Sequence, residues 1–264
     1  MSVIELNGHH VHFREFGDPG LPLLVLVHGL YGDSSTVAPL AERLADRFHV
    51  IAPDALGHGR SDHPAEFTLE DQGTMLDALV ATLGHTAATL AGVSMGSYLA
   101  AEAAILEPER VSHLVLVVGK AHGTTSSSAA YAARMGFDLA KATPDEMLAF
   151  MAGAIWSPDT TPERRAEILA MQAESQVVLT PEERAAVERS LAGFDLRPEL
   201  HRITAATLVI SGRDDGLNPP EAGEELARHI PGARFEVYEH SGHVLAFEEE
   251  DKLVADIMEF VLTT

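Results

Sequence analysis

Short, continuous apolar runs recur along the chain and predict buried strands. The strongly apolar runs lie at 23–27, 50–52, 114–118 and 207–210. Runs of leucine and β-branched residues without polar alternation are typical of parallel strands that are covered on both faces. A further run at 235–238 is less apolar, so we expect it nearer an edge of the sheet.

Helix-prone segments separate these strands. Examples are 36–47 and 68–83. Strands that alternate with helices imply a parallel sheet with right-handed crossover connections. The pattern therefore predicts an α/β fold with a doubly wound, mostly parallel sheet.

The stretch from 122 to 200 departs from this rhythm, because it contains no convincing strand. Thr143-Pro144-Asp145-Glu146 and Thr180-Pro181-Glu182-Glu183 each combine a capping threonine, a proline and a glutamate three residues after the threonine. That combination is typical of a helix start. We expect a helical cap over 122–200, inserted into a core made of 1–121 and 201–264.

Composition narrows the possible partners. The chain has 264 residues, enough for one full core, and a formal net charge of -22. Such a charge repels polyanions, so we expect no nucleic acid as a partner. The apolar runs are too short to cross a bilayer and the first eight residues lack the features of a signal peptide, so we expect no membrane association. Cysteine is absent, which excludes thiol chemistry and fits a cytoplasmic protein.

Other polar features have ordinary interpretations. The acidic run at 248–251 is expected to be a solvated helix start, where negative charge suits the helix dipole. His10 and His12 share one face of a predicted first strand, and without a nearby third ligand we expect a solvated face and no metal. Glycine-rich phosphate-binding motifs are absent as well, so no cofactor is expected.

The pentapeptide Gly92-Val93-Ser94-Met95-Gly96 is the strongest candidate for chemistry. It stands between a small, mostly apolar run at 86–91 and a helix-prone run at 97–106. A serine at the apex of such a strand–turn–helix is strained and lifted toward solvent, ready to attack a carbonyl. The glycines suit positions where the strand and helix backbones nearly touch. The motif alone is weak evidence, so a base, an acid and oxyanion donors must come from elsewhere in the chain.

Candidates for the base and the acid follow the last predicted strands. His243 lies in a loop after the run at 235–238, and ligand chemistry gathers at the carboxyl ends of parallel strands. Its neighbour His240 is interpreted as structural. Asp214 and Asp215 follow the preceding strand, and spacing alone does not choose between them.

Two backbone N–H groups are expected to bind the oxyanion of a tetrahedral intermediate. Met95, at the start of the helix after Ser94, supplies one. Leu30, in the loop His28-Gly29-Leu30-Tyr31-Gly32, supplies the other. The turn Gly57-His58-Gly59 is interpreted as shaping the pocket rather than acting in catalysis.

Together these motifs resemble the α/β-hydrolase-fold serine hydrolases. The landmarks occur in the order of that family, namely His28-Gly29, Gly57-His58-Gly59-Arg60-Ser61, Gly92-Val93-Ser94-Met95-Gly96, Pro108-Glu109-Arg110-Val111, Gly212-Arg213-Asp214-Asp215 and Gly242-His243. The resemblance covers nearly the whole chain, and 122–200 corresponds to the family's variable cap. It favours Asp215 over Asp214 and implies a catalytic triad of Ser94, Asp215 and His243.

The resemblance implies an enzyme that hydrolyses carboxylic esters of small, largely apolar substrates through an acyl-enzyme on Ser94. The large side chains of the cap have two interpretations. In the first, they only pack the cap helices onto the core. In the second, some of them also form the roof of an apolar substrate pocket, together with Tyr31 from the core. In the second interpretation the pocket residues are Tyr31, Phe137, Met147, Met151 and Trp156.

Other functions are compatible with the same triad. An enol-lactonase, a hydrolase of C–C bonds in ring-cleavage products, and a cofactor-free haloperoxidase or perhydrolase are the enzymatic alternatives. A ligand receptor on the same fold is the non-enzymatic one, because a fold does not determine a function. The sequence leaves the natural substrate and the oligomeric state open.

Overall fold

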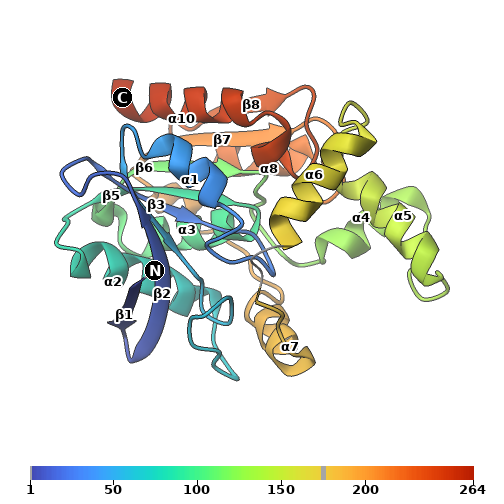
Figure 1. The fold of residues 1–264 in the computed structure, drawn as a ribbon, viewed down its shortest axis with the longest axis horizontal. Coiled ribbons are helices and arrows are strands. Elements are labelled where there is room, and N and C mark those ends of the chain that lie inside the picture. Colours follow the sequence, from blue (N-terminus) through green and yellow to red (C-terminus); the bar gives the residue numbers. More distant parts are fainter. Residues whose placement is uncertain (1, 174–176) are drawn as a thin grey trace.

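An eight-stranded sheet lies at the centre of the computed structural model, which describes residues 2–173 and 177–264 (Figure 1). The strands are β1 (Ser2–Leu6), β2 (His9–Phe16), β3 (Leu23–Val27), β4 (His49–Pro53), β5 (Ala88–Val93), β6 (Val111–Val117), β7 (Ala206–Gly212) and β8 (Arg234–Tyr238). Across the sheet they run in the order β1-β2-β4-β3-β5-β6-β7-β8. β2 is antiparallel to β1 and β4, and the other neighbouring pairs are parallel. The predicted mostly parallel sheet is confirmed, with β8 at its edge.

Helices cover both faces of this sheet (Figure 1). Their bounds are α1 (Ala38–Leu44), α2 (Leu69–Thr82), α3 (Met95–Leu106), α8 (Pro220–His229), α9 (Leu245–Glu248) and α10 (Glu250–Thr263), with 3₁₀ turns at Pro108–Arg110 and Leu200–Arg202. Residues of α2, α3 and α8 share one buried apolar cluster, and residues of α1 and α10 share the other. This layering confirms the doubly wound α/β fold.

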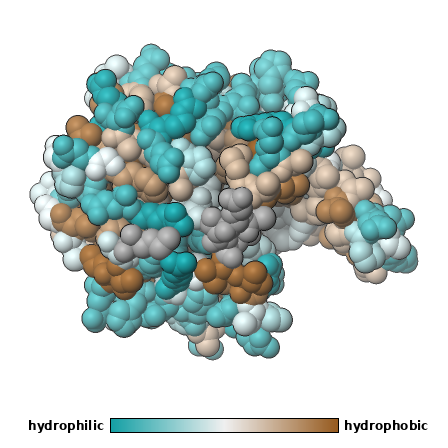
Figure 2. Space-filling view, viewed as in Figure 1, coloured by the Kyte–Doolittle hydropathy of each residue, from teal (hydrophilic) through white to brown (hydrophobic). Residues whose placement is uncertain are grey.

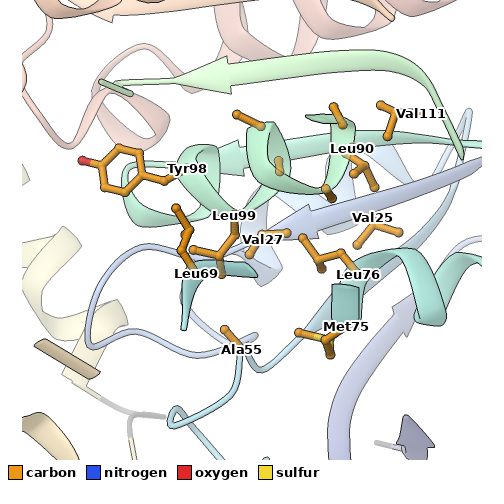
Figure 3. Close-up of a cluster of buried hydrophobic side chains, with 14 of the residues drawn as sticks. Val25, Val27, Ala55, Leu69, Met75, Leu76, Leu90, Tyr98, Leu99 and Val111 are labelled. Carbon is orange, nitrogen blue, oxygen red and sulfur yellow. The ribbon is translucent and has the colours of Figure 1, made fainter. Parts of the chain in front are cut away.

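Strand β3 shows why the apolar runs are continuous. Neighbouring side chains of a strand point to opposite faces of the sheet. Leu24 and Leu26 belong to the cluster under α1 and α10. Val25 and Val27 belong to the cluster under α2 and α3, which Figure 3 shows. Both faces of the strand are therefore buried, and apolar–polar alternation would place polar side chains in one of the two cores.

The described part of the chain between β6 and β7 is helical. It contains α4 (Ser127–Met135), α5 (Pro144–Ile155), α6 (Pro162–Ala173) and α7 (Pro181–Ser190). α5 and α7 begin with the predicted capping boxes, at Thr143 and Thr180. In Figure 1, α4 and α5 project beyond the edge of the sheet. The boundaries of the cap at 122 and 200 stay a prediction, and an isolated β-bridge joins His122 to Asp195 near its two ends.

Exposed apolar side chains gather on this helical segment. Figure 2 shows brown apolar residues on the projecting lobe as well as on the main body, between hydrophilic ones. The large exposed apolar residues between β6 and β7 are Met135, Leu148, Leu169, Met171, Val177 and Val178. The segment is thus packed on fewer sides than the core helices.

A buried histidine lies in β2, where a solvated face was expected. His10 is exposed as predicted, but His12 is buried, with Nδ1 2.9 Å from Oδ2 of Asp54. Burial alone would raise the pKa of the Asp54 carboxyl, but hydrogen bonds from Ser34 and Arg60 hold this pKa below its usual value. The expectation was wrong for His12, because a carboxylate from the end of β4 reaches across to it.

Candidate active site

Ser94 lies at the sharp turn between β5 and α3, with φ 54° and ψ -114°. This backbone is in the left-handed half of φ space, which a residue with a side chain rarely adopts. A Cβ atom on Gly92 would lie 2.1 Å from the carbonyl oxygen of Gly96, and one on Gly96 would lie 2.2 Å from that of Val27. The strand and helix backbones therefore approach as the motif predicts, and only glycine fits at both positions.

The predicted base and acid lie beside this serine. His243, in the loop after β8, places Nε2 2.9 Å from Oγ of Ser94. Its Nδ1 lies 2.8 Å from Oδ2 of Asp215, which follows β7. Because a carboxylate only accepts hydrogen bonds, Nδ1 carries the proton, and Nε2 is left to accept a hydrogen bond from the serine hydroxyl. The three residues form one directional chain of hydrogen bonds.

The structure distinguishes the two neighbouring aspartates. The side chain of Asp215 is fully buried, and its Oδ1 also accepts hydrogen bonds from the N–H groups of Leu217 and Asn218, at 2.8 and 2.9 Å. Asp214 instead accepts a hydrogen bond from the Ser157 hydroxyl at 2.7 Å. Only Asp215 contacts the histidine, which is the choice that the resemblance favoured.

His240 and His58 lie away from this chain of hydrogen bonds. His240 is exposed and pairs with Asp159 at 2.6 Å, which raises the pKa of the imidazole. His58 is fully buried, and burial lowers its pKa to about 3. Its ring packs edge-on against His28 at 5.2 Å. Both histidines thus have structural contacts of their own.

The residues predicted as oxyanion donors flank Ser94. Met95 is the first residue of α3, so its N–H has no carbonyl in a preceding helical turn to bond. Leu30 lies in the loop after β3, and a Cβ atom on its neighbour Gly29 would lie 3.6 Å from Cβ of Ser94. Leu30 and Met95 both line the cavity at the serine.

A neutral histidine holds this loop in place. Nδ1 of His28 donates a hydrogen bond to the carbonyl oxygen of Gly29 at 2.8 Å. Its Nε2 accepts one from the N–H of Ala55 at 3.1 Å. Each ring nitrogen is therefore committed in the neutral form, and burial lowers the pKa of His28. Protonation would break the bond to Ala55 and release one support of the loop.

A cavity of about 920 Å³ opens onto Ser94 and His243. Of the predicted pocket residues, Tyr31 and Met151 line it. The Tyr31 hydroxyl also donates a hydrogen bond to Glu188 of α7 at 2.6 Å, and burial raises the pKa of Tyr31 to about 12. This bond connects the loop after β3 with a helix of the cap.

Three predicted pocket residues lie outside the lining of this cavity. Phe137 stacks on Phe150 with ring centres 4.0 Å apart, inside the α4–α5 part of the cap. Trp156 is buried under the guanidinium of Arg165, 5.7 Å from its ring centre. Met147 lies one helical turn before Met151 on α5. The cavity lining therefore does not include these three predicted residues, and Phe137 and Trp156 contact other side chains of the cap instead.

Several lining residues were not anticipated. They include Tyr98, Lys120, Phe194, Leu217 and Asn218. Lys120 carried the clearest signal, since it follows the 114–118 strand at its carboxyl end. The others come from a helix interior, the far end of the cap and a turn, and the sequence pattern does not place them together.

The acidic run at 248–251 agrees with its prediction in part, because α10 begins at Glu250 and Asp251 is exposed. Glu248 and Glu249 are half-buried rather than solvated. Oε2 of Glu248 accepts a hydrogen bond from the N–H of Gly242 at 2.6 Å, and Oε2 of Glu249 accepts one from the Ser241 hydroxyl at 2.6 Å. These carboxylates hold the loop that carries His243.

Two kinds of feature are absent from residues 2–173 and 177–264. Within these ranges, no group of three histidine, cysteine, aspartate or glutamate residues is placed to hold a metal ion. Nor do the described helices include one with the length and apolar character needed to span a membrane.

Known proteins share this fold across nearly the whole chain. A model of the α/β hydrolase fold family matches residues 22–250. The proline iminopeptidase PfmaB of Pestalotiopsis fici is 26% identical, over 97% of this chain and 98% of its own. The enol-lactonase from Burkholderia xenovorans LB400 has 26% identity and a TM-score of 0.83, covering 99% of this chain and 100% of its own. A thermophilic esterase from Thermogutta terrifontis has 28% identity and a TM-score of 0.80, covering 99% of this chain and 98% of its own. The chain belongs to the α/β-hydrolase fold family and is a hydrolase of that family.

Proposed function

We propose that this protein is a serine hydrolase that cleaves carboxylic esters through an acyl-enzyme on Ser94. The observation that carries the proposal is the hydrogen-bond chain from Ser94 Oγ to His243 Nε2 at 2.9 Å and from His243 Nδ1 to Asp215 at 2.8 Å. A neutral hydroxyl is a poor nucleophile, and a base within hydrogen-bond distance makes it reactive. The three side chains come from separate loops, so their convergence is not a product of local sequence.

The proposed reaction proceeds in two halves. Ser94 Oγ attacks the ester carbonyl while His243 Nε2 takes its proton, and Asp215 stabilises the resulting imidazolium. The N–H groups of Leu30 and Met95 bind the oxyanion of the tetrahedral intermediate. His243 then protonates the leaving alcohol, and the acyl group stays on Ser94. A water molecule, deprotonated by His243, releases the acid by the same steps in reverse order.

An apolar patch forms part of the wall contributed by the cap, beside polar side chains such as Gln172 and Glu188. Met151 and Ile155 of α5 and Leu191 after α7 face the cavity. Such a surface favours small, largely apolar parts of a substrate over strongly hydrated ones.

Lactone hydrolysis is the second candidate function. It is favoured by the likeness to the enol-lactonase from Burkholderia xenovorans LB400, which extends over 99% of this chain. A lactone is a cyclic ester, so the same attack, oxyanion and deacylation steps apply. The two functions differ only in whether the leaving alcohol stays attached to the acyl group.

A substrate panel tests these proposals. Short-chain 4-nitrophenyl esters, simple lactones and vinylogous diketones are compared in the wild type and in Ser94→Ala. We expect turnover of esters or lactones, and a loss on the order of 10⁶ in kcat in the variant, because a triad acts as a unit. Labelling of Ser94 by a fluorophosphonate probe is the independent check. Ester turnover by Ser94→Ala at the wild-type rate would exclude the proposed nucleophile, and turnover of diketones alone would identify a C–C bond hydrolase.

A further inference from the structure

A cationic side chain lies in the cavity near the proposed nucleophile. Lys120 comes shortly after β6 and lines the same cavity as Ser94 and His243. Its ammonium group lies 5.8 Å from the ring centre of Tyr98 and 5.9 Å from that of Phe194. Two aromatic side chains therefore hold a positive charge at a defined place on the cavity wall.

The hydrogen bonds around Lys120 have a defined direction. The amide nitrogen of Asn218 donates to the carbonyl oxygen of Val118 at 2.7 Å, which fixes the orientation of that amide. Oδ1 of Asn218 therefore accepts a hydrogen bond from the Ser127 hydroxyl at 2.8 Å. Ser127 Oγ in turn accepts one from Nζ of Lys120 at 2.9 Å. An ammonium group has three N–H donors, so two remain without a partner in the described part of the chain.

Lys120 also has no carboxylate partner among the residues that the structure describes. The chain's other lysines, Lys141 and Lys252, lie 2.8 Å from Asp138 and 2.6 Å from Asp256. By contrast, no acidic group in residues 2–173 or 177–264 lies within 4.0 Å of Nζ of Lys120. Burial lowers the pKa of Lys120, because a charge removed from water is costly until an anion pairs with it. Among the described residues this cation therefore has no carboxylate partner, although the sequence contains 40 acidic and only 18 basic residues.

We propose that Lys120 binds an anionic group of the substrate, and that the preferred substrates are carboxylic esters carrying a second, ionised carboxylate. This inference rests on the proposed ester hydrolysis at Ser94. The carboxylate accepts hydrogen bonds from the two unused N–H donors of Lys120, and such charge-assisted bonds are stronger than those between neutral groups. The apolar surface of Met151 and Ile155 takes the carbon chain between the two carboxyl functions.

A purely structural role for Lys120 makes a different prediction. In that case the ammonium group would only hold Ser127 and pack on the rings of Tyr98 and Phe194. Its removal would then change the turnover of every ester by the same factor. The charge of the substrate is therefore the variable that separates the two roles.

Matched pairs of esters test the proposal. On the acyl side, 4-nitrophenyl hydrogen glutarate is compared with its methyl ester. On the alcohol side, 4-acetoxybenzoate is compared with methyl 4-acetoxybenzoate. For each pair, kcat/KM of the anionic ester is divided by kcat/KM of the neutral ester. This ratio is measured for the wild type, Lys120→Met and Lys120→Arg at neutral pH and low ionic strength. Lys141→Met is the matched control, because it removes the same charge from an exposed site of the cap.

We expect Lys120→Met to lower this ratio by about 10- to 100-fold in at least one pair, the usual effect of a lost hydrogen bond to a charged group. Lys120→Arg should keep most of the preference, and Lys141→Met should not change it. A change in the ratio below about 2-fold in both pairs overturns the proposal, because it means that anionic and neutral substrates are affected equally.

A binding measurement separates this inference from the proposed function. The dissociation constants of both glutarate esters are measured by calorimetry with Ser94→Ala and with Ser94→Ala carrying Lys120→Met. Weaker binding of the anionic ester alone, by about 10-fold, supports the proposal even if the wild type hydrolyses neither ester. Equal loss for both esters, or no loss, overturns it. Failure of both the anionic and the neutral esters to react in the wild type counts against the proposed function alone.

Discussion

Oε2 of Glu248 accepts a hydrogen bond from the backbone N–H of Gly242 at 2.6 Å. Gly242 directly precedes His243 in the chain. The other oxygen of Glu248 accepts hydrogen bonds from the N–H of Ser157 and the hydroxyl of Thr160, at 2.9 and 2.6 Å. One carboxylate therefore ties the histidine loop to the segment after α5. A movement of that segment is coupled to the position of the proposed base.

Glu248→Gln should lower kcat more than it raises KM. An amide has a single oxygen, so one of the N–H groups now bonded to Glu248 must face an N–H₂ group instead. We expect about a 10-fold loss in kcat with KM changed by less than about 2-fold, because His243 shifts relative to Ser94. Asp251→Asn alters an exposed charge of the same acidic run and is the control. Unchanged kcat in Glu248→Gln, with a lowered melting temperature only, would mean that Glu248 serves stability alone.

The two neighbouring aspartates give a sharper test of the proposed triad. Asp215→Asn should lower kcat by about 10³- to 10⁴-fold, because the amide no longer holds the tautomer of His243 that accepts the serine proton. Asp214→Asn keeps an oxygen to accept the Ser157 hydroxyl and should retain activity within about 3-fold. Both variants lose one charge, so net charge does not explain a difference. Equal activities, measured as kcat on the same ester, would contradict the assignment of Asp215.

The sequence predicts the elements of this site well where local rules determine the structure. The carboxyl ends of parallel strands meet at one edge of a sheet, so the residues after β5, β7 and β8 had to lie together. Capping at Thr143 and Thr180 depends on three or four neighbouring residues, and both helix starts agree with it. The glycines of the turn at Ser94 are likewise required by the close local approach of the strand and helix backbones.

Contacts between distant segments were much harder to predict. The pairing of His12 with Asp54 and of Glu248 with Gly242 depends on how separate loops pack, which periodicity does not encode. In the cap, Phe137 has the same apolar character as a pocket residue, but it stacks on Phe150 instead. Sequence reasoning thus found the chemistry and its approximate place, but not the residues that shape the cavity.

Gly96→Ala should abolish activity and destabilise the protein. The added methyl group would lie 2.2 Å from the carbonyl oxygen of Val27 and 2.8 Å from that of His28, and backbone atoms of a buried strand end cannot move aside. We expect a loss of about 3 kcal/mol in the free energy of unfolding. Urea unfolding and ester turnover are the measurements.

Gly153→Ala is the matched control for this substitution. Gly153 is an exposed position of α5, where the nearest atom to an added Cβ is the Tyr131 hydroxyl at 3.4 Å. Alanine is favoured over glycine within a helix, so stability should rise by about 0.5–1 kcal/mol. The same methyl group is thus expected to act with opposite sign at the two sites. Similar effects at both sites would show that the backbone crossing at Gly96 is not the cause.

Ionisation of the buried Asp77 carboxyl in α2 should lower the free energy of unfolding as pH rises from about 4 to about 7. Its carboxylate is buried, and neither oxygen has a hydrogen-bond partner in the described part of the chain. Burial raises its pKa from 3.8 to about 7, the charge of Glu107 adds to this, and Arg110 opposes it. The folded state therefore binds this proton more tightly than the unfolded state. Stability is highest below the unfolded pKa and is lost as the group ionises up to the folded pKa.

Asp77→Asn removes the buried charge and keeps the shape of the side chain. It should raise the free energy of unfolding at pH 8 by about 1–3 kcal/mol, and the gain should shrink toward zero below about pH 3, where Asp77 is neutral in both states. Urea unfolding at several pH values between these limits measures the trend. Asp46→Asn makes the same change at an exposed position and is the matched control. A gain that is equal at all pH values would assign the effect to packing rather than to ionisation, because only ionisation depends on the proton concentration.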